Sequence, residues 1–571
     1  MKAMRSSLSG VCRLAMLLTA LAVAGCAGDE VTGPNQGVAT VELQGPASGD
    51  RVYIGRQLTL RAATFDRDHQ PLTGTTVSWS ISDNRKADLV CSTSTCQLIA
   101  KAAGPAVVTA TSGKASSSVS LTIAEIPVAL VVMQPGTGAV YVGAGTQFTA
   151  TLFDSAGTVL SGRAVTWKSS DAARAVVDSK GLVQGLGAGP VVITASGGET
   201  SATAEVQVLA APVADWSGAT QDWTTFQGNA RHDGYVPVVV DPRVMHRAWL
   251  WAGAQTTPLN PVTTGDGRVY VSGGAKLWVL NLSNGSDAWA HEFGPVNSVG
   301  PAAYANGTVY LQTGGHGDSY VWAFNAADGA QRFRTPYANQ WSKYKAPTIV
   351  GNRLFMGGGL YGGMYSFDAE SGSERWFDVL DQVEGFTPSV VDSTVYAYTG
   401  VYRPRLTAAD AATGEVRYEI PDPHFSYSLY VVDGPPVAGT LNDMIITQNS
   451  RLLAFDLRDR RVAWEITSGF RGGVTVANGV IYVINHDHFE ARRESDGALL
   501  WSWTPPQGEP VGTIIATKNV LFLGTTSSTY AIDIAARAMV WSTPTPGALA
   551  MSKTGQLLIS GSGLMTSWAV R

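Results

Sequence analysis

The sequence predicts an all-β protein, and three observations carry this prediction. Short apolar stretches alternate with turns along the chain, whose 571 residues include 63 glycines. Residues 262–545 repeat one unit: a glycine turn, two short apolar strands, an acidic or amide residue near glycine, and an aromatic residue. Residues 39–209 contain a second, longer repeat. A strand-built period of about 40 residues is typical of β-propeller blades, and a longer strand-rich repeat is typical of β-sandwiches.

The first 25 residues predict a signal peptide that is removed from the mature protein. Lys2 and Arg5 make a basic start, residues 14–24 are apolar except for Thr19, and small residues precede Cys26. This apolar run is too short to span a bilayer. The segment resembles the bacterial lipobox, which implies that Cys26 is acylated and becomes the new N-terminus. The alternative is an ordinary secretory signal in which Cys26 occurs by chance.

The residues after the cysteine bear on location. Ala27, rather than aspartate, follows Cys26, and by resemblance to Gram-negative sorting rules this favours the outer membrane. Residues 26–37 are small and polar, and they predict a flexible tether. We therefore expect a lipid-anchored protein of the bacterial cell envelope, facing either the periplasm or the exterior. The formal net charge is −5 and no basic run occurs, so nucleic acid is not an expected partner.

Cys91 and Cys96 are the cysteines that remain beyond the leader and Cys26. Outside the cytoplasm, such a close pair predicts a disulfide, and no further Cys or His stands beside it to complete a zinc site. We expect the disulfide to close a hairpin of the first long repeat, without a redox role.

The two long repeats span residues 38–125 and 126–210. The motif VSWSISD around Trp79 matches VTWKSSD around Trp167, and both copies alternate apolar and polar residues at the strand period. They resemble the bacterial Ig-like domain of group 2, which implies two tandem Ig-like β-sandwiches. We expect both tryptophans in the cores, with ligand binding as the alternative. The acidic turns FDRDHQ and FDSAG offer too few carboxylates to predict a calcium site.

The propeller is predicted over residues 222–571, after a linker at 211–221. Seven complete repeats end in an aromatic residue: Trp289, Phe333, Trp376, Tyr418, Trp464, Trp501 and Trp541. A lone strand with Trp249 and Trp251 precedes them, and three strands without a fourth follow them. These two chain ends complete each other, which predicts an eight-bladed ring without free sheet edges. The aromatic residues are expected to pack between neighbouring blades.

The opening of this part is DWTTFQGN followed by His232-x-Gly234, and the repeat line is clearest in LTAADAATGEVRY. Both resemble the quinoprotein-like (PQQ-like, WD40-like) propellers. That family includes PQQ-dependent alcohol dehydrogenases and the propeller lipoprotein of outer-membrane barrel assembly. The dehydrogenases hold PQQ with a vicinal cysteine pair, a stacking tryptophan and calcium. This propeller has no cysteine and no C-x-x-C-H motif, so neither PQQ with calcium nor covalent haem is expected.

No catalytic constellation can be assembled from the sequence, and no catalytic residue is predicted. His486 and His488 would share one face of a strand, as two metal ligands do, but no third ligand can be named. His232 and Asp233 could line a face of the propeller. So could three aromatic residues of one segment, which are Phe425, Tyr427 and Tyr430. All of these are equally compatible with ordinary turns and loops.

The predicted function is a binding or assembly scaffold in the envelope. A propeller exposes a broad face of loops that suits a protein or glycan partner, and the Ig-like domains would hold it away from the membrane. One alternative is a PQQ-dependent oxidoreductase, which the missing cysteines disfavour. The other is an adhesion protein that binds a surface polysaccharide. The sequence does not identify the partner.

Overall fold

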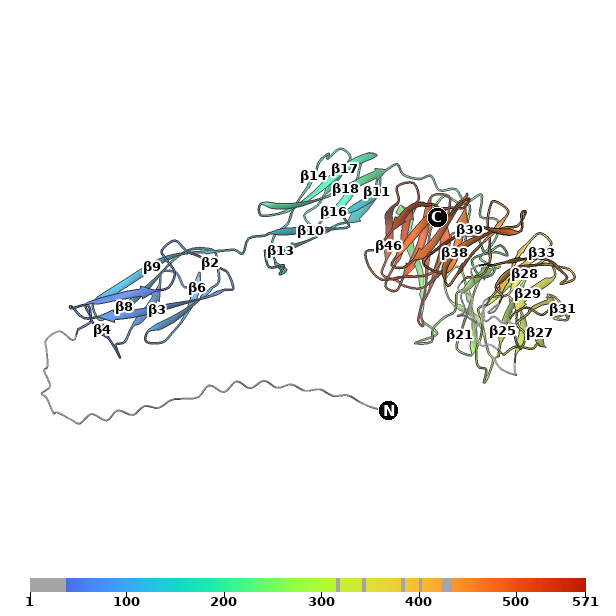
Figure 1. Ribbon diagram of the computed structural model, residues 1–571, viewed down its shortest axis with the longest axis horizontal. Coiled ribbons are helices and arrows are strands. Elements are labelled where there is room, and N and C mark those ends of the chain that lie inside the picture. Colours follow the sequence, from blue (N-terminus) through green and yellow to red (C-terminus); the bar gives the residue numbers. More distant parts are fainter. Residues whose placement is uncertain (1–36, 315–318, 341–345, 382–385, 400–402, 424–433) are drawn as a thin grey trace. The chain divides into compact units, whose positions relative to one another are not determined.

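A computed structural model describes residues 37–571 apart from 315–318, 341–345, 382–385, 400–402 and 424–433 (Figure 1). The chain forms two compact units, Met1–Pro127 and Val128–Arg571. Its regular structure consists of strands and, in the described residues, one short 3-10 helix, η1 (Pro242–Val244). Over those same residues, no helix has the length and apolar character needed to cross a membrane. The all-β prediction is confirmed.

The first long repeat forms a sandwich of two sheets (Figure 1). Its strands are β1 (Thr40–Gln44), β2 (Arg51–Tyr53), β3 (Gln57–Phe65), β4 (Pro71–Leu72), β5 (Ser78–Ile81), β6 (Ala87–Cys91), β7 (Thr95–Ala100), β8 (Gly104–Ser112) and β9 (Ala115–Ala124). One sheet has the order β1-β3-β7-β6, with β4 beside β3, and the other has the order β2-β9-β8-β5. Successive strand side chains point to opposite faces, so every second residue of β9 is buried toward its end. Trp79 packs against the core that includes Leu60, Val108 and Leu121, as expected for a core tryptophan.

Cys91 and Cys96 face each other across the β6–β7 hairpin and are joined by a disulfide. The acidic turns of both copies use their first aspartate to hold the backbone. Asp66 Oδ1 accepts the N–H groups of the residues two and four positions further on, at 2.9 Å each. Asp154 Oδ1 accepts the equivalent pair at 2.9 and 2.8 Å. In both turns, therefore, one carboxylate oxygen is already engaged in building the turn itself.

The second long repeat has a similar order of strands, although among its described residues two short strands replace the long β3 and no strand corresponds to β4. Its strands are β10 (Leu130–Gln134), β11 (Thr137–Tyr141), β12 (Gly145–Gln147), β13 (Thr149–Phe153), β14 (Thr166–Ser169), β15 (Ala175–Val177), β16 (Leu182–Gly185), β17 (Gly189–Gly197) and β18 (Thr200–Leu209). β11 runs parallel to β18, just as β2 runs parallel to β9 in the first copy. Trp167 packs against the core that contains Phe148, Ile193 and Val206.

The propeller follows from β19 onward. Its strands up to residue 421 are β19 (His246–Trp251), β20 (Thr263–Gly265), β21 (Arg268–Gly273), β22 (Lys276–Asn281), β23 (Asp287–Glu292), β24 (Ala303–Ala305), β25 (Thr308–Thr313), β26 (Tyr320–Asn325), β27 (Gln331–Pro336), β28 (Thr348–Val350), β29 (Arg353–Gly357), β30 (Met364–Asp368), β31 (Glu374–Asp378), β32 (Ser389–Val391), β33 (Thr394–Thr399), β34 (Arg405–Asp410) and β35 (Val416–Pro421). The remaining strands are β36 (Val437–Ala438), β37 (Asp443–Gln448), β38 (Ser450–Asp456), β39 (Arg461–Ala477), β40 (Val480–Asn485), β41 (His488–Arg493), β42 (Leu499–Trp503), β43 (Pro510–Ala516), β44 (Val520–Thr525), β45 (Thr529–Asp533), β46 (Ala538–Thr543), β47 (Ala548–Ser552), β48 (Gln556–Ser560) and β49 (Met565–Ala569).

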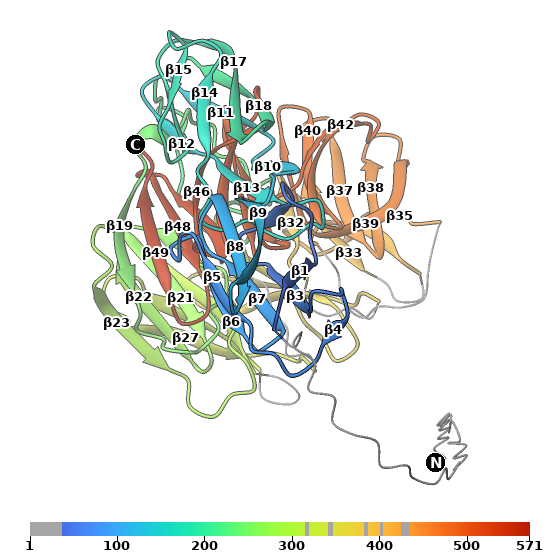
Figure 2. The ribbon, with the colours of Figure 1, turned by 90° about the vertical axis from the view of Figure 1, so that its left-hand side faces the viewer.

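Most of these strands form four-stranded antiparallel sheets in chain order, such as β20-β21-β22-β23. One sheet joins the two ends of the propeller: β19 pairs with β49 in the order β19-β49-β48-β47, and Figure 2 shows the green β19 beside the red β49. The split unit that the sequence predicts is therefore present. β39 is long enough to pair with β38 through its first half and with β40 through its second, so β36 to β42 make one seven-stranded sheet. Because two repeats share this sheet, the count of eight blades stays a prediction.

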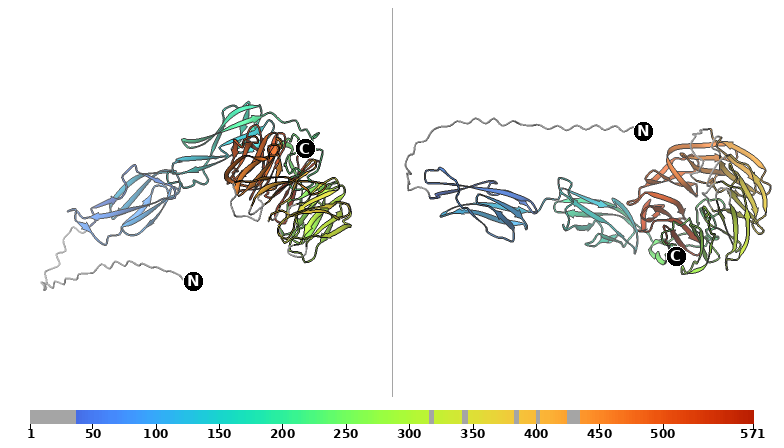
Figure 3. Two further views of the ribbon diagram at one scale, coloured as in Figure 1. Left: turned by 45° about the vertical axis from the view of Figure 1, so that its right-hand side comes forward. Right: turned by 90° about the horizontal axis from the view of Figure 1, so that it is seen from below.

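The innermost strands of the sheets form a closed ring (Figure 3, right). β20, β24, β28, β32, β36, β39, β43 and β47 touch in that order, and β47 touches β20. Side-chain hydroxyls link neighbours in this ring. Thr263 donates to Ala302 O at 3.1 Å, and Thr475 donates to Ile514 O at 2.6 Å. Each hydroxyl satisfies a carbonyl that the neighbouring sheet leaves unused, which favours a fixed spacing of the sheets.

The repeated aromatic residue and the repeated glycine are partners across neighbouring sheets. At Gly414, where φ is 79°, a β-carbon would lie 2.7 Å from the ring of Trp376 on the preceding sheet. The indole Nε1 of Trp376 also donates to Ala411 O at 3.3 Å. The same indole-to-carbonyl bond joins Trp289 to Ala326 O at 3.0 Å. The glycine of the repeat is therefore needed for two reasons: its positive φ and the ring that lies against it.

Within the second unit, the second Ig-like domain contacts the propeller. Tyr141 of β11 donates from its hydroxyl to Asp533 Oδ2 at 2.6 Å, and both groups are buried. Burial and this bond raise the pKa of Tyr141. Arg243 adds a bond to Val142 O at 3.1 Å while its guanidinium also pairs with Asp241. The buried Tyr141–Asp533 bond, with the more exposed Arg243 contact beside it, favours a fixed joint between the domain and the sheet that contains β46.

Candidate functional site at the propeller axis

Residues 222–236, which we call the axial segment, run along the inner ring and pair with its strands one after another. Trp223 O accepts from the N–H of Thr264 on β20 at 2.8 Å, and Thr224 O accepts from Tyr304 on β24 at 2.8 Å. Further along, carbonyls of the segment accept from Val390 on β32, Ala438 on β36, Val476 on β39 and Ala516 on β43, at 2.8 to 3.0 Å. The segment thus occupies the inward edges of six inner strands, which would otherwise be unpaired.

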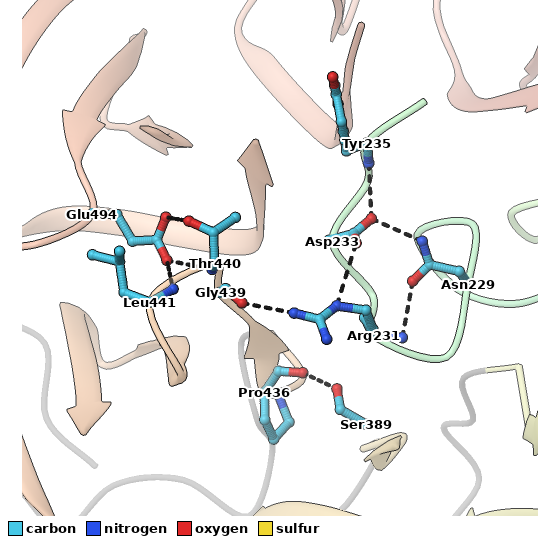
Figure 4. A network of polar contacts seen from close by, with 10 residues as sticks. All are labelled: Asn229, Arg231, Asp233, Tyr235, Ser389, Pro436, Gly439, Thr440, Leu441 and Glu494. Carbon is cyan, nitrogen blue, oxygen red and sulfur yellow. Dashed lines mark hydrogen bonds and ion pairs between the residues drawn. The ribbon is translucent and has the colours of Figure 1, made fainter. Parts of the chain in front are cut away.

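Local sequence explains the tight course of the segment. Asn229 Oδ1 accepts the N–H of Arg231, and Asp233 Oδ1 accepts the N–H of Tyr235 and the amide of Asn229, at 2.8 to 3.1 Å (Figure 4). Asn229 and Asp233 each accept the backbone N–H two residues further along the chain, and these bonds stabilise two successive turns. Gly234 has φ of 66°, and a β-carbon there would lie 3.0 Å from Ile514 O. The motif DWTTFQGN followed by His232-x-Gly234 therefore contains the residues that stabilise the turns of the axial segment.

His232 lies at the centre of these contacts and is fully buried. Its Nδ1 lies 2.6 Å from Phe226 O, and its Nε2 lies 3.0 Å from Pro388 O and 3.2 Å from Thr348 Oγ1. The sequence had suggested that His232 could line a face of the propeller. The structure instead places it inside, where it joins the axial segment to β28 and to the residue before β32.

A cavity of about 360 Å³ lies beside the axial segment. Its lining includes Asp222, Trp223, Asn229, Arg231, Asp233 and Tyr235. The charged groups of the lining are paired: Asp222 lies 3.1 Å from Lys553 Nζ, and the Asp233 carboxylate lies 3.8 Å from Arg231 Nε. Burial raises the pKa of Asp233, although its backbone and amide donors oppose the shift. The cavity is of a size that accepts a small polar ligand.

The residues at the propeller axis do not fit the PQQ and calcium that PQQ-dependent dehydrogenases hold. The inward edges of six inner strands are taken by the axial segment, and Gln227 and His232 of that segment are buried against the ring. Of the two acidic side chains beside the cavity, Asp222 is paired with Lys553, and Asp233 accepts the amide of Asn229. These residues therefore leave no PQQ and calcium site at the axis within the described part of the chain.

The two histidines singled out as weak metal candidates lie at the β40–β41 turn. His486 has a positive φ of 51° inside the turn, so it does not share a regular strand face with His488, which begins β41. His488 contacts Asp487 Oδ1 at 3.0 Å and Glu490 Oε1 at 3.1 Å. Burial opposes protonation of His488, but these carboxylates outweigh it and raise its pKa. In the part of the chain that the structure describes, no three metal-binding side chains gather.

Several expectations fall on residues that the structure does not describe. Cys26 and the signal peptide lie before residue 37, and Phe425, Tyr427 and Tyr430 lie in the segment 424–433. All of these stay predictions.

Comparison with known proteins now places the chain in a family. A family model described as outer membrane protein assembly factor BamB matches residues 232–466 and 448–567. Because this match covers more than half of the chain, the chain belongs to that family. The model of the bacterial Ig-like domain, group 2, matches residues 127–208, which is the second long repeat. The resemblances drawn from the repeat motifs are therefore confirmed for the propeller and for an Ig-like domain.

Individual relatives are more distant. Ice-binding protein 1 of Shewanella frigidimarina is 35% identical over 106 residues, which are 18% of this chain and 12% of that protein. The chain thus spans about an eighth of this curated relative. Among solved structures, a europium-containing methanol dehydrogenase aligns with 62% of this chain and 99% of its own, at 12% identity and a TM-score of 0.49. BamB from Moraxella catarrhalis aligns with 57% and 97%, at 17% identity and a TM-score of 0.43.

Two polar clusters were not anticipated from the sequence. Arg451 is buried between Asp422 and Glu465, and Glu494 is buried beside Asp443. Glu494 replaces an apolar residue at a position where the other complete repeats keep one, so a residue-by-residue alignment of the repeats is the signal that would have revealed it.

Proposed function

We propose that this protein is a lipid-anchored envelope scaffold whose propeller binds a protein partner during outer-membrane protein assembly. The observation that carries the proposal is the family match over residues 232–567. The family is described as an outer membrane protein assembly factor. A propeller built around its own axial segment presents loops and rims, rather than an open axis, to a partner.

One rim offers an apolar surface for such a partner. Leu360 and Tyr361 of the β29–β30 loop are 53% and 73% exposed, and Val379, just after β31, is 74% exposed. Phe377 of β31, with 38% exposure, lies beside the same loop: its ring is near Gly359 and Gly363, and its centroid is 4.3 Å from that of Tyr365. We call these four exposed residues the rim patch. Large apolar side chains gathered on a surface are typical of protein-binding sites.

Substitution of the rim patch tests the proposal. We expect Tyr361→Glu and Val379→Glu in the full chain to reduce recovery of envelope proteins in a pull-down at least tenfold, because a charge replaces an apolar contact at the interface centre. The matched control is Leu499→Glu, which alters a residue of 51% exposure at the start of β42. Leu499 begins the fourth strand of its repeat whereas Val379 follows the end of one, so the two positions lie at opposite ends of the sheets. Equal recovery with all three variants would count against the rim patch as the binding surface.

The anchor has a test of its own. We expect labelled palmitate to be incorporated into the wild-type chain expressed in a Gram-negative host and to be lost in Cys26→Ser. Each buried methylene contributes about 0.8 kcal/mol of membrane affinity, so the variant should also move from the membrane fraction to the soluble fraction. Undiminished labelling of Cys26→Ser would refute acylation at this residue.

A further inference from the structure

One repeat departs from the others at a buried position. Glu494 directly follows the third strand of its repeat, where the six other complete repeats carry Leu282, Ala326, Ala369, Ala411, Leu457 and Ile534. The positions are structurally equivalent, because in each case the backbone N–H donates to the turn before the second strand; for Glu494 the acceptor is Gly479 O at 2.9 Å. A carboxyl group has thus replaced an apolar side chain in this repeat alone, and Glu494 is fully buried.

The Glu494 carboxylate is held by hydrogen-bond donors of the neighbouring repeat (Figure 4). Oε1 accepts the backbone N–H groups of Thr440 and Leu441, the latter at 2.9 Å, and Oε2 accepts the hydroxyl of Thr440 at 2.6 Å. Three donors of one loop thus converge on this carboxyl group. Glu494 therefore fastens the loop 439–442, which joins β36 to β37, to the sheet that continues through β41.

A second buried carboxyl group faces the first. Asp443 begins β37 and is 7% exposed, and its Oδ1 has no hydrogen-bond partner within the described residues. Burial, followed by the charge of Glu494, raises the pKa of Asp443 to about 8. Two buried carboxyl groups at contact cannot both ionise without a large electrostatic penalty. A proton on Asp443 removes this conflict, because the neutral acid can donate to the Glu494 carboxylate.

The pair also connects to the axial segment. Arg231 Nη2 donates to Gly439 O at 2.7 Å (Figure 4). Arg231 O also accepts from Ala438 N at 3.0 Å. Gly439 lies against both carboxyl groups, since a β-carbon there would meet the side chains of Asp443 and Glu494. A shift of the loop 439–442 would therefore pull on the side chain of Arg231.

Other charged groups around the pair are already engaged. Asp456 lies opposite Asp443 across β37 and β38, and Arg461 approaches it at 3.9 Å. Arg493, next to Glu494 in sequence, pairs with Asp496 at 2.7 Å. The guanidinium of Arg231 is directed to a backbone carbonyl and to Asp233. No cation among the described residues is paired with the two buried carboxyl groups in place of a proton.

We propose that Asp443 and Glu494 share one proton, and that this proton makes the attachment of the loop 439–442 and of the axial segment sensitive to pH. The sign follows from linkage. A carboxyl group whose pKa is raised in the closed form keeps its proton there but releases it when the loop opens. The free energy that this proton contributes to the closed form of the loop is therefore fully present below the ordinary aspartate pKa of about 3.9. It is lost as the pH rises toward about 8.

Hydrogen exchange of the full chain tests this, read by mass spectrometry on peptides that cover 222–236 and 439–442. In the wild type, the opening constant should rise about tenfold per pH unit between pH 5 and pH 7, after correction for intrinsic exchange. In Asp443→Asn, whose amide donates to Glu494 at every pH, this rise should disappear. Asp496→Asn removes a half-exposed carboxyl group of the same turn and should keep the wild-type course. The same course in the wild type and Asp443→Asn would overturn the proposal.

A second variant and a second readout cover the case in which Asp443→Asn does not fold. Glu494→Leu installs the residue that two other repeats carry and should also abolish the pH dependence. On the wild type itself, the infrared spectrum at pH 7 should contain a carboxylic-acid carbonyl band that is lost on titration to pH 10. Retention of the pH dependence in Glu494→Leu, or absence of any such titrating band, would contradict a shared proton.

Discussion

Trp376→Ala is expected to lower the free energy of unfolding of the propeller by about 3–5 kcal/mol, the range for removing a buried large aromatic side chain. Trp376 is 9% exposed, its ring lies against Gly414, and its indole donates to Ala411 O. The substitution therefore removes apolar burial, leaves a cavity between two sheets, and deletes the bond that joins them. Denaturant unfolding followed by tryptophan fluorescence and circular dichroism measures the change.

Trp376→Phe is the matched control, because the second repeat already carries Phe333 at this position, where its ring lies against Gly372. This variant keeps a ring on Gly414 but loses the indole hydrogen bond and part of the buried ring, so the expected loss is about 1–2 kcal/mol. If Trp376→Ala changed stability by no more than Trp376→Phe does, the packing between sheets would not depend on the repeated aromatic residue.

Arg451→Met is expected to have an effect of similar size, about 3–5 kcal/mol, for an electrostatic reason. Arg451 is 6% exposed; its Nη1 donates to Asp422 Oδ1 at 3.1 Å and to Glu465 Oε1 at 3.1 Å. Asp422 is 5% exposed and also accepts the hydroxyl of Tyr398 at 2.8 Å. Removal of the guanidinium takes away the positive charge and the hydrogen bonds that Arg451 supplies to two acidic side chains, and thermal and denaturant unfolding measure the loss.

Two further variants separate this charge effect from lost packing. Arg493→Met removes an arginine whose partner Asp496 is half-exposed, and the expected loss is about 0–1 kcal/mol. The double variant Arg451→Met with Asp422→Asn should recover part of the stability, because the buried negative charge that Arg451 faces is removed as well. A double variant as unstable as the single one would show that Arg451 acts through packing alone.

The repeats made the fold accessible from the sequence. Strands, turns and aromatic residues recur at fixed spacing, which predicts the repeated sheets. The lone first strand, which contains Trp249, pairs with β49, as the incomplete repeats at the two ends of the propeller predict. The sequence could not show that β39 continues through two repeats, because this depends on how residues 467–472 bend between two pairing partners. Nor could it show that the ring of Trp376 lies on the glycine of the next repeat, since spacing alone does not say which sheet an aromatic residue contacts.

The axis was only partly predictable. The motif that contains His232 and Gly234 marked the start of the propeller, yet its winding path becomes visible only when the inner strands it pairs with are in place. The same holds for the buried charges. Asp443 and Glu494 are 51 positions apart and meet only because two repeats share one seven-stranded sheet, so their contact cannot be predicted from a local pattern.

The scaffold function is tested most directly by photo-cross-linking in living cells. A photoreactive phenylalanine analogue replaces Tyr361 in the rim patch of the full, anchored chain, and the same analogue replaces Leu499 at the opposite end of the sheets as the control. We predict that illumination joins the position-361 variant to a discrete envelope protein, identified by mass spectrometry, and that the position-499 variant gives no such product. Equal products from both positions, or none from either, would contradict a propeller that binds its partner through this rim.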